Sequence, residues 1–141
     1  MNDPVVLDAW PIMRYAENNP TIVAELNQLI SSSNPPIVCS INLGEAHYSL
    51  ARRDGFVEAD DMWDRVCGFA AVEPPTLAVT RRASQLVVRN RIPWADAHAA
   101  ATALAHNAVV WAGDEHLNKP GPWKRRDLRK LVVNPRSGRK K

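Results

Sequence analysis

The sequence predicts an α/β protein, a three-layer sandwich with a mainly parallel central sheet flanked by helices. Short apolar runs alternate along the chain with longer segments of helical periodicity, a pattern typical of parallel strands joined by helices. The chain has 141 residues, 45% of them hydrophobic and 23% charged, which fits one globular domain with its own core. We expect that domain to cover residues 1–134 and a basic, flexible tail to follow at residues 135–141.

The predicted strands are short apolar runs that end at a polar residue or a turn. They cover residues 5–7, 37–40 and 108–111, with two further short strands near Val72 and at residues 131–133. In sheets of parallel strands, ligands bind beyond the carboxyl ends of the strands. Residues that directly follow these runs are therefore the first candidates for a functional site.

The predicted helices have apolar residues at intervals of three and four, and most begin at a proline or a capping residue. They cover residues 11–18, 21–30, 42–55, 57–69 and 77–88, and a last, alanine-rich helix starts at Pro93. Pro11 suits a first helical turn, whereas Thr21 and Thr76 suit the N-cap position. Gly44 either weakens its helix or leaves a gap for another backbone or a ligand.

Four acidic residues are expected at the same edge of this sheet. Asp8 and Asp114 directly follow strands, and Glu45 and Asp96 open helices. All four places belong to the edge formed by the carboxyl ends of the strands. Local explanations also exist. Asp8 could cap the next helix, Glu45 and Asn42 have the spacing of a capping box, and Asp96 is a favourable charge at a helix N-terminus. An interaction protein in which every acid is a cap therefore remains an alternative.

Gathered carboxylates repel one another and need a counter-charge to stay ionised. Oxygen ligands favour Mg²⁺ or Mn²⁺ over zinc, and such an ion can activate water for attack on a phosphodiester. The chain contains neither a glycine-rich phosphate loop nor the serine elbow GxSxG. The four histidines lack metal-ligand spacing, and Cys39 and Cys67 are expected to be buried apolar residues. The acids thus favour nuclease chemistry.

Charge is distributed unevenly along the chain. Residues 119–141 hold ten of the 18 Lys and Arg and one acid, about +9, so residues 1–118 carry 8 minus 14, or −6. The basic segment is either a solvated end or a surface that attracts phosphates. No apolar run has the roughly 18 residues of a membrane helix, and the N-terminus lacks a secretory signal. We therefore expect a cytoplasmic protein that makes no membrane contact.

Taken in order, the acidic segments resemble those of PIN-domain proteins, specifically VapC-type ribonuclease toxins of type II toxin–antitoxin pairs. The matching segments are VVLDAW with Asp8, SINLGEAHYSLARR with Glu45, and IPWADAHAAATALAHNAVVWAGDEHL with Asp96 and Asp114. The order and spacing of these acids match the family's pattern to about Leu117. The resemblance implies a PIN-like fold for the predicted domain.

The resemblance also implies a function. Such proteins are Mg²⁺- or Mn²⁺-dependent endoribonucleases that cleave cellular RNA, form homodimers and are neutralised by a cognate, VapB-like antitoxin. Asp8, Glu45, Asp96 and Asp114 would be the catalytic metal ligands. The basic residues that would then contact RNA phosphates are Lys124, Arg125, Arg126, Arg129 and Lys130.

The chain departs from the family pattern next to its first and last acids. Many members have a hydroxyl residue just after the first Asp and two residues before the last, where this chain has Ala9, Trp10 and Ala112. Asn42, Glu115 and His116 are the nearest candidates to replace that support. A non-catalytic RNA-binding or regulatory PIN-like module, with weak metal affinity, is therefore the alternative function.

Overall fold

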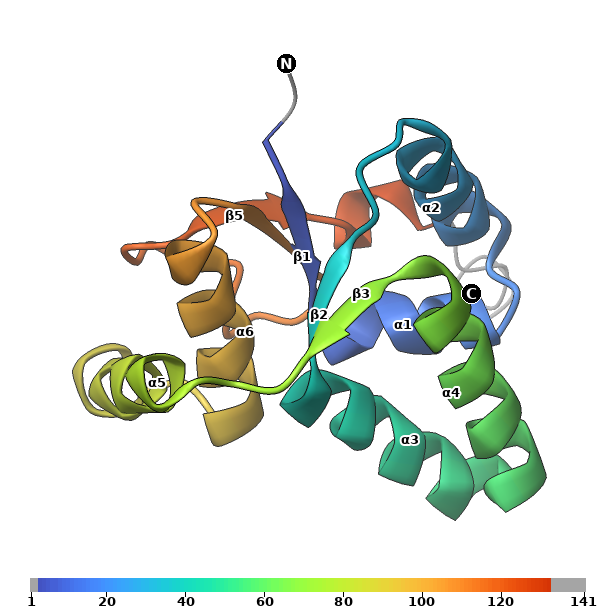
Figure 1. Ribbon diagram of the computed structural model, residues 1–141, viewed down its shortest axis with the longest axis horizontal. Coiled ribbons are helices and arrows are strands. Elements are labelled where there is room, and N and C mark those ends of the chain that lie inside the picture. The colour runs from blue at the N-terminus through green and yellow to red at the C-terminus, as the bar shows by residue number, and fades with distance from the viewer. Residues whose placement is uncertain (1–2, 133–141) are drawn as a thin grey trace, which may run out of the picture.

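The computed structural model describes residues 3–132, which form a five-stranded parallel sheet between two layers of helices (Figure 1). The strand order is β3-β2-β1-β4-β5. The strands are β1 (Val5–Leu7), β2 (Ile37–Cys39), β3 (Ala71–Glu73), β4 (Val109–Ala112) and β5 (Lys124–Asp127). Each pair of neighbouring strands is parallel, so all carboxyl ends lie at one edge. The predicted α/β sandwich is confirmed.

Helices cover both faces of the sheet. One layer contains α1 (Ala9–Ala16), α2 (Pro20–Ser31), α3 (Ser40–Asp54) and α4 (Phe56–Phe69). The other layer contains α5 (Leu77–Asn90) and α6 (Trp94–Ala105), which lie to the left of the sheet in Figure 1. A short 3₁₀ helix, η1 (Arg129–Leu131), follows β5. Within the described range, no helix has both the length and the apolar character needed to cross a membrane.

The core is divided by the sheet because successive side chains of a strand point to opposite faces. In β1, Val5 and Leu7 pack under the four-helix layer, and Val6 packs under α5 and α6. Five alanines of α6 are buried against the sheet: Ala97, Ala99, Ala100, Ala101 and Ala103. Their small side chains let α6 approach the strands closely, which fixes the first turn of α6 at the carboxyl edge.

The predicted edge strand at residues 131–133 is wrong. The edge strand is β5, whose sequence KRRD pairs in parallel with β4. Because its residues are mostly basic, this strand could not be recognised from an apolar pattern. The buried side chains of Trp123 and Leu128 anchor its two ends. Leu131 lies in η1 instead, and residue 133 and the predicted tail at 135–141 lie outside the described residues.

The structure also tests two predicted helix caps and the predicted burial of the two cysteines. Thr76 caps α5, since its hydroxyl accepts a hydrogen bond from the Val79 N–H at 3.1 Å. The predicted Thr21 cap is wrong, because Asn19 caps α2 by accepting from the Ile22 N–H at 3.2 Å. Cys39 is buried as expected, but Cys67 is exposed because it lies on the outer side of α4.

Candidate metal centre

The fold brings three of the four acids together at the carboxyl edge of the sheet. One carboxylate oxygen from each of Asp8, Glu45 and Asp96 lies within 4.8 Å of the other two. Asp8 is only 1% exposed and Asp96 only 5% exposed, whereas Glu45 is half-buried. An interaction protein whose acids are separate helix caps does not account for this cluster.

Asp8 directly follows β1, and its backbone N–H donates to the Trp111 carbonyl of β4 at 3.1 Å. It occupies the N-cap position of α1, but its side chain makes no capping hydrogen bond. The Asp8 carboxylate is instead contacted by Asn42, whose amide Nδ2 donates to Asp8 Oδ1 at 3.4 Å. The capping explanation for Asp8 is therefore wrong.

The capping box predicted for Asn42 and Glu45 is also wrong, because α3 begins at Ser40, before Asn42. Both residues lie inside the helix, with Glu45 in its second turn, so neither can cap it. Asn42 is fully buried and donates to the Ala95 carbonyl at 2.9 Å as well as to Asp8. Asn42 thus links α3 and β1 to the first turn of α6, which carries Asp96.

Asp114 lies at the margin of the three-acid cluster. Its Oδ1 accepts a hydrogen bond from the Leu117 N–H at 3.1 Å, which orders the turn after β4. Its negative charge nevertheless raises the pKa of Asp8, Glu45 and Asp96, so it belongs to the same electrostatic environment.

The acids are costly to keep ionised together. Burial, followed by repulsion from Asp96, Asp114 and Glu45, raises the pKa of Asp8 well above its usual value. Burial and the charges of Asp114 and Glu45 raise the pKa of Asp96 to about 7. Burial first, and Asp114 second, raise the pKa of Glu45. A cation at this edge would supply the missing counter-charge.

The residues present fit a hard divalent cation. Oxygens that share an ion at about 2.1 Å lie at most about 4.2 Å apart. The three carboxylate oxygens lie within 4.8 Å of one another, so a small side-chain adjustment is enough to bring them to one ion. Asn42 Oδ1 is buried and has no hydrogen-bond partner among residues 3–132. A buried amide oxygen without a donor is unfavourable, and water carried by an ion would satisfy it.

The positions that lack the family's hydroxyl residues are filled in other ways. The Trp10 ring packs against Gly113, where even a Cβ would overlap the indole. The Ala112 carbonyl accepts from Asn118 Nδ2 at 3.2 Å. Of the three proposed replacements, Asn42 contacts the acids, and in the described part of the chain Glu115 and His116 have no hydrogen bond to them. A Cβ at Gly44 would meet nothing within 4 Å among residues 3–132, so no other backbone packs closely there and the space beside Gly44 is open.

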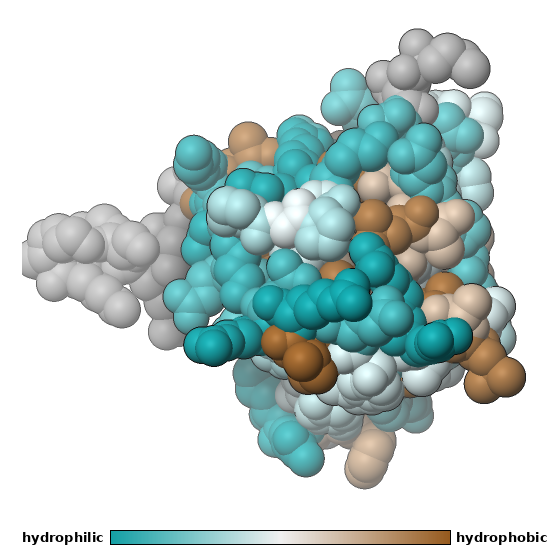
Figure 2. All heavy atoms as spheres, turned by 90° about the vertical axis from the view of Figure 1, so that its left-hand side faces the viewer, coloured by the Kyte–Doolittle hydropathy of each residue, from teal (hydrophilic) through white to brown (hydrophobic). Residues whose placement is uncertain are grey.

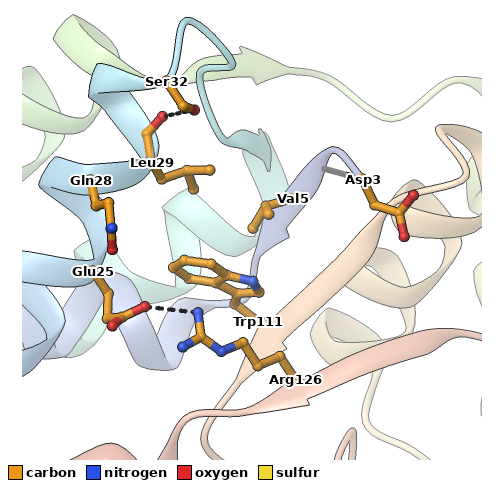
Figure 3. Close-up of a pocket in the computed structure, with 8 residues that line it drawn as sticks. All are labelled: Asp3, Val5, Glu25, Gln28, Leu29, Ser32, Trp111 and Arg126. Atoms are coloured by element: carbon orange, nitrogen blue, oxygen red, sulfur yellow. Dashed lines mark hydrogen bonds and ion pairs between the residues drawn. The ribbon is translucent and has the colours of Figure 1, made fainter. Parts of the chain in front are cut away.

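The five basic residues predicted to bind RNA do not form one free surface. Lys124, Arg126 and Arg129 pair with acids Asp3, Glu25 and Asp127 at 3.4, 2.8 and 2.7 Å. Figure 3 shows Arg126 reaching Glu25 beside the Trp111 ring, in a pocket between α2 and the sheet. The Arg126 guanidinium carbon lies 4.7 Å from the centroid of the Trp111 ring. Arg125 and Lys130 are exposed and form no ion pair among residues 3–132.

Sequence patterns missed a support under the first turn of α6. His98 is 1% exposed, and its Nδ1 lies 3.0 Å from the Trp94 carbonyl, to which it can donate. The His98 ring also meets the Trp94 ring edge to face, with centroids 4.4 Å apart. Because Asp96 lies in this turn, His98 helps to hold its backbone. The four-residue spacing of Trp94 and His98 was the available signal.

Comparison with solved structures shows where this fold occurs. VapBC2 from Rickettsia felis, bound to a promoter DNA fragment, is 18% identical over 87% of this chain and 97% of that chain, with a TM-score of 0.72. DNA-bound VapBC from Salmonella typhimurium is 16% identical over 90% and 98%, with a TM-score of 0.73. VapC20 from Mycobacterium tuberculosis, a Sarcin-Ricin loop cleaving toxin, is 19% identical over 81% and 93%, with a TM-score of 0.64.

At these identities the structures show a shared fold. A comparison with curated proteins found no match. A comparison with protein families matched the PIN domain to residues 5–121, which include the three clustered acids and Asp114. The chain therefore belongs to the PIN domain family.

Proposed function

We propose that this protein is a VapC-type toxin, an endoribonuclease that hydrolyses phosphodiester bonds of cellular RNA with Mg²⁺ or Mn²⁺. The observation that carries this proposal is the cluster of Asp8, Glu45 and Asp96, three carboxylates within 4.8 Å whose pKa values are all raised. Membership of the PIN family, whose members are nucleases, supports the same conclusion.

Asp8, Glu45 and Asp96 would hold the ion, and Asp114 would complete the acidic site from the turn after β4. When bound, such an ion activates a water and stabilises negative charge on the phosphoryl oxygens. Asn42 orients the Asp8 carboxylate through its Nδ2 group. Burial of Asp8 and Asp96 keeps bulk water from competing with the ligand oxygens.

The partner that would control this activity is a VapB-like antitoxin. Support comes from the solved structures with this fold, several of which are VapBC assemblies or a toxin–antitoxin complex. We further propose, from the family resemblance, a homodimer in the cytoplasm, with residues 1–134 as the PIN domain and 135–141 as a flexible tail. Among the C-terminal basic residues, Arg125 and Lys130 are the better candidates for RNA contacts, because the other three would first have to break ion pairs.

Purified protein tests the nuclease directly. The wild-type chain should cleave RNA with Mn²⁺, stop in EDTA and recover when Mn²⁺ is restored. Asp8→Asn should remove activity, whereas Asp64→Asn, an exposed acid on α4, should not. Cleavage that survives both EDTA and Asp8→Asn would contradict a mechanism based on these carboxylates.

A non-catalytic RNA-binding module is the second candidate function. It is favoured by Ala9, Trp10 and Ala112, which offer no hydroxyl to the ligand shell. Calorimetric titration separates the two candidates. Mn²⁺ binding with cleavage supports the nuclease, and RNA affinity without Mn²⁺ binding at millimolar concentration supports the module.

A further inference from the structure

Helix α5 carries the clearest concentration of unpaired positive charge in the described part of the chain. Its sequence, LAVTRRASQLVVRN, contains three arginines and no acid, and Arg91 follows as its C-cap residue. Arg81, Arg89 and Arg91 are exposed, and Arg82 is half-buried. We call these four residues the α5 arginine surface. Figure 2 shows this side of the molecule, where hydrophilic side chains surround isolated hydrophobic ones.

The four arginines form no ion pair among residues 3–132, and the one side-chain hydrogen bond there is a 3.4 Å contact from Arg82 to Gln85. This differs from the C-terminal basic run, where Lys124, Arg126 and Arg129 are already neutralised. An RNA phosphate should therefore bind the α5 arginine surface more favourably than the C-terminal basic run, since no existing ion pair has to be broken on α5.

This surface is joined to the acidic site through the loop after β4. Asn118 Nδ2 donates to the Asp114 carbonyl at 2.8 Å. The next residue, Lys119, donates through Nζ to the Asn90 carbonyl, at the last residue of α5, also at 2.8 Å. The end of α5 that carries Arg89 and Arg91 is thus fixed beside the segment that carries Asp114.

An exposed aromatic residue follows Arg91 in the sequence and precedes Asp96. Trp94 is 50% exposed and opens α6, two positions before Asp96. Its ring meets His98 at an interplanar angle of 82°, so buried His98 supports it. Exposed aromatic rings next to basic residues stack unpaired bases of single-stranded RNA.

We infer that the α5 arginine surface and Trp94 bind the RNA substrate on one side of the acidic cluster. The arginines contact consecutive phosphates, and Trp94 stacks an unpaired base next to the acids. Arg81 and Arg89 are eight residues apart, about 12 Å along the helix, so they can contact different phosphates of one RNA strand. The substrate class is RNA with an unpaired nucleotide, as in a loop or bulge. The position of cleavage beside Trp94 rests on the proposed function, whereas RNA binding by the α5 arginine surface does not.

A second copy of this chain fits the same surface less well. A symmetric contact between two α5 helices would bring the same arginines face to face, and like charges repel. The exposed apolar residues here, Leu77 and Val88, alternate with arginine and serine on α5 and form no continuous apolar face.

Fluorescence anisotropy with a labelled RNA hairpin, in EDTA to prevent cleavage, tests the inference. Arg89→Gln with Arg91→Gln should flatten the plot of log affinity against log salt by about 1.4, which is 0.7 for each of two phosphates. The control is Arg52→Gln with Arg65→Gln, an equal loss of charge on the four-helix layer, which should leave the slope unchanged. Trp94→Ala should weaken binding of the looped RNA about fivefold or more and leave a fully paired duplex unaffected.

The inference is overturned if the variant lacking all four arginines keeps the wild-type affinity and salt slope. It is also overturned if that variant changes only the oligomeric state, measured by light scattering, because the surface would then contact protein. Thermal melting followed by circular dichroism checks that each variant folds. Binding that depends on α5 without cleavage in Mn²⁺ would refute the proposed function alone. Cleavage by wild type, with unaltered RNA binding by the four-arginine variant, would refute this inference alone.

Discussion

Asp96→Asn is expected to stabilise the metal-free protein although it removes a ligand of the proposed ion. Asn has nearly the same shape as Asp but carries no charge. It therefore removes the cost of burying a carboxylate and the repulsion from Asp114 and Glu45, which together raise the pKa of Asp96. The same change should abolish the increase in melting temperature that Mn²⁺ gives the wild-type protein.

The size of the stabilisation expected from Asp96→Asn follows from the raised pKa of Asp96. A carboxyl whose pKa is about 7 in the folded state, against the ordinary value of 3.8 for Asp, binds its proton more tightly when the protein is folded. Its contribution to stability is complete below the unfolded value and is lost as the pH rises through the folded value. About three pKa units, at about 1.4 kcal/mol each, amount to about 4 kcal/mol at pH 8. At pH 5 the expected gain from Asn is less than about 2 kcal/mol.

Calorimetric melting in EDTA at pH 8 and pH 5 measures this effect. A gain of about 4 kcal/mol corresponds to an increase of about 10 °C in melting temperature for a domain of this size. Asp64→Asn, an exposed acid on α4, is the control and should change stability by less than about 0.5 kcal/mol at either pH. A variant that is less stable than wild type at pH 8, or that gains as much at pH 5, would refute the reasoning.

Further changes test other parts of the site. Mn²⁺ affinity measured by calorimetry should fall from pH 8 to pH 6, because protons compete for Asp8 and Asp96, and a pH-independent affinity would argue against a carboxylate site. Asn42→Ala should lower the free energy of unfolding by about 1–3 kcal/mol in urea, since it removes the hydrogen bond that the buried Asn42 side chain donates to the Ala95 carbonyl. Unchanged stability would count against that role. Gly113→Ala should lower the free energy of unfolding by about 1–3 kcal/mol, because the new Cβ overlaps Trp10. Gly44→Ala, in open space, should raise it by about 0.5–1 kcal/mol. Equal effects of the two changes would be inconsistent with this packing.

Some features of the fold were accessible from local patterns. The strands at residues 5–7 and 37–40 were predictable because a buried parallel strand is a short apolar run between turns. The edge strand β5 was not, because its residues KRRD are basic and its position depends on backbone pairing with β4. Apolar composition identifies a strand that is buried on both faces, and it fails for the edge strand β5, whose four residues are all charged.

The first residue of helix α3 could not be predicted from local spacing. Asn42 and Glu45 have the spacing of a capping box, yet α3 begins at Ser40 because β2 leads directly into the helix. That shift places both side chains beyond the cap, where they face partners on other elements. Asn42 contacts Asp8 and Ala95, 34 and 53 positions away along the chain, and neither contact is encoded in local spacing.

The sequence by itself determined the α/β alternation and the placement of Asp8, Glu45, Asp96 and Asp114 toward one edge, because chain direction decides which ends of parallel strands meet. The tertiary structure alone decided which acids come within reach of one another. It also decided that Asp114 accepts from the Leu117 N–H and that Arg126 pairs with Glu25. These outcomes depend on side chains brought together by packing across the sheet, so the positive charge that remains available to a ligand is found on α5 rather than on the more basic C-terminal segment.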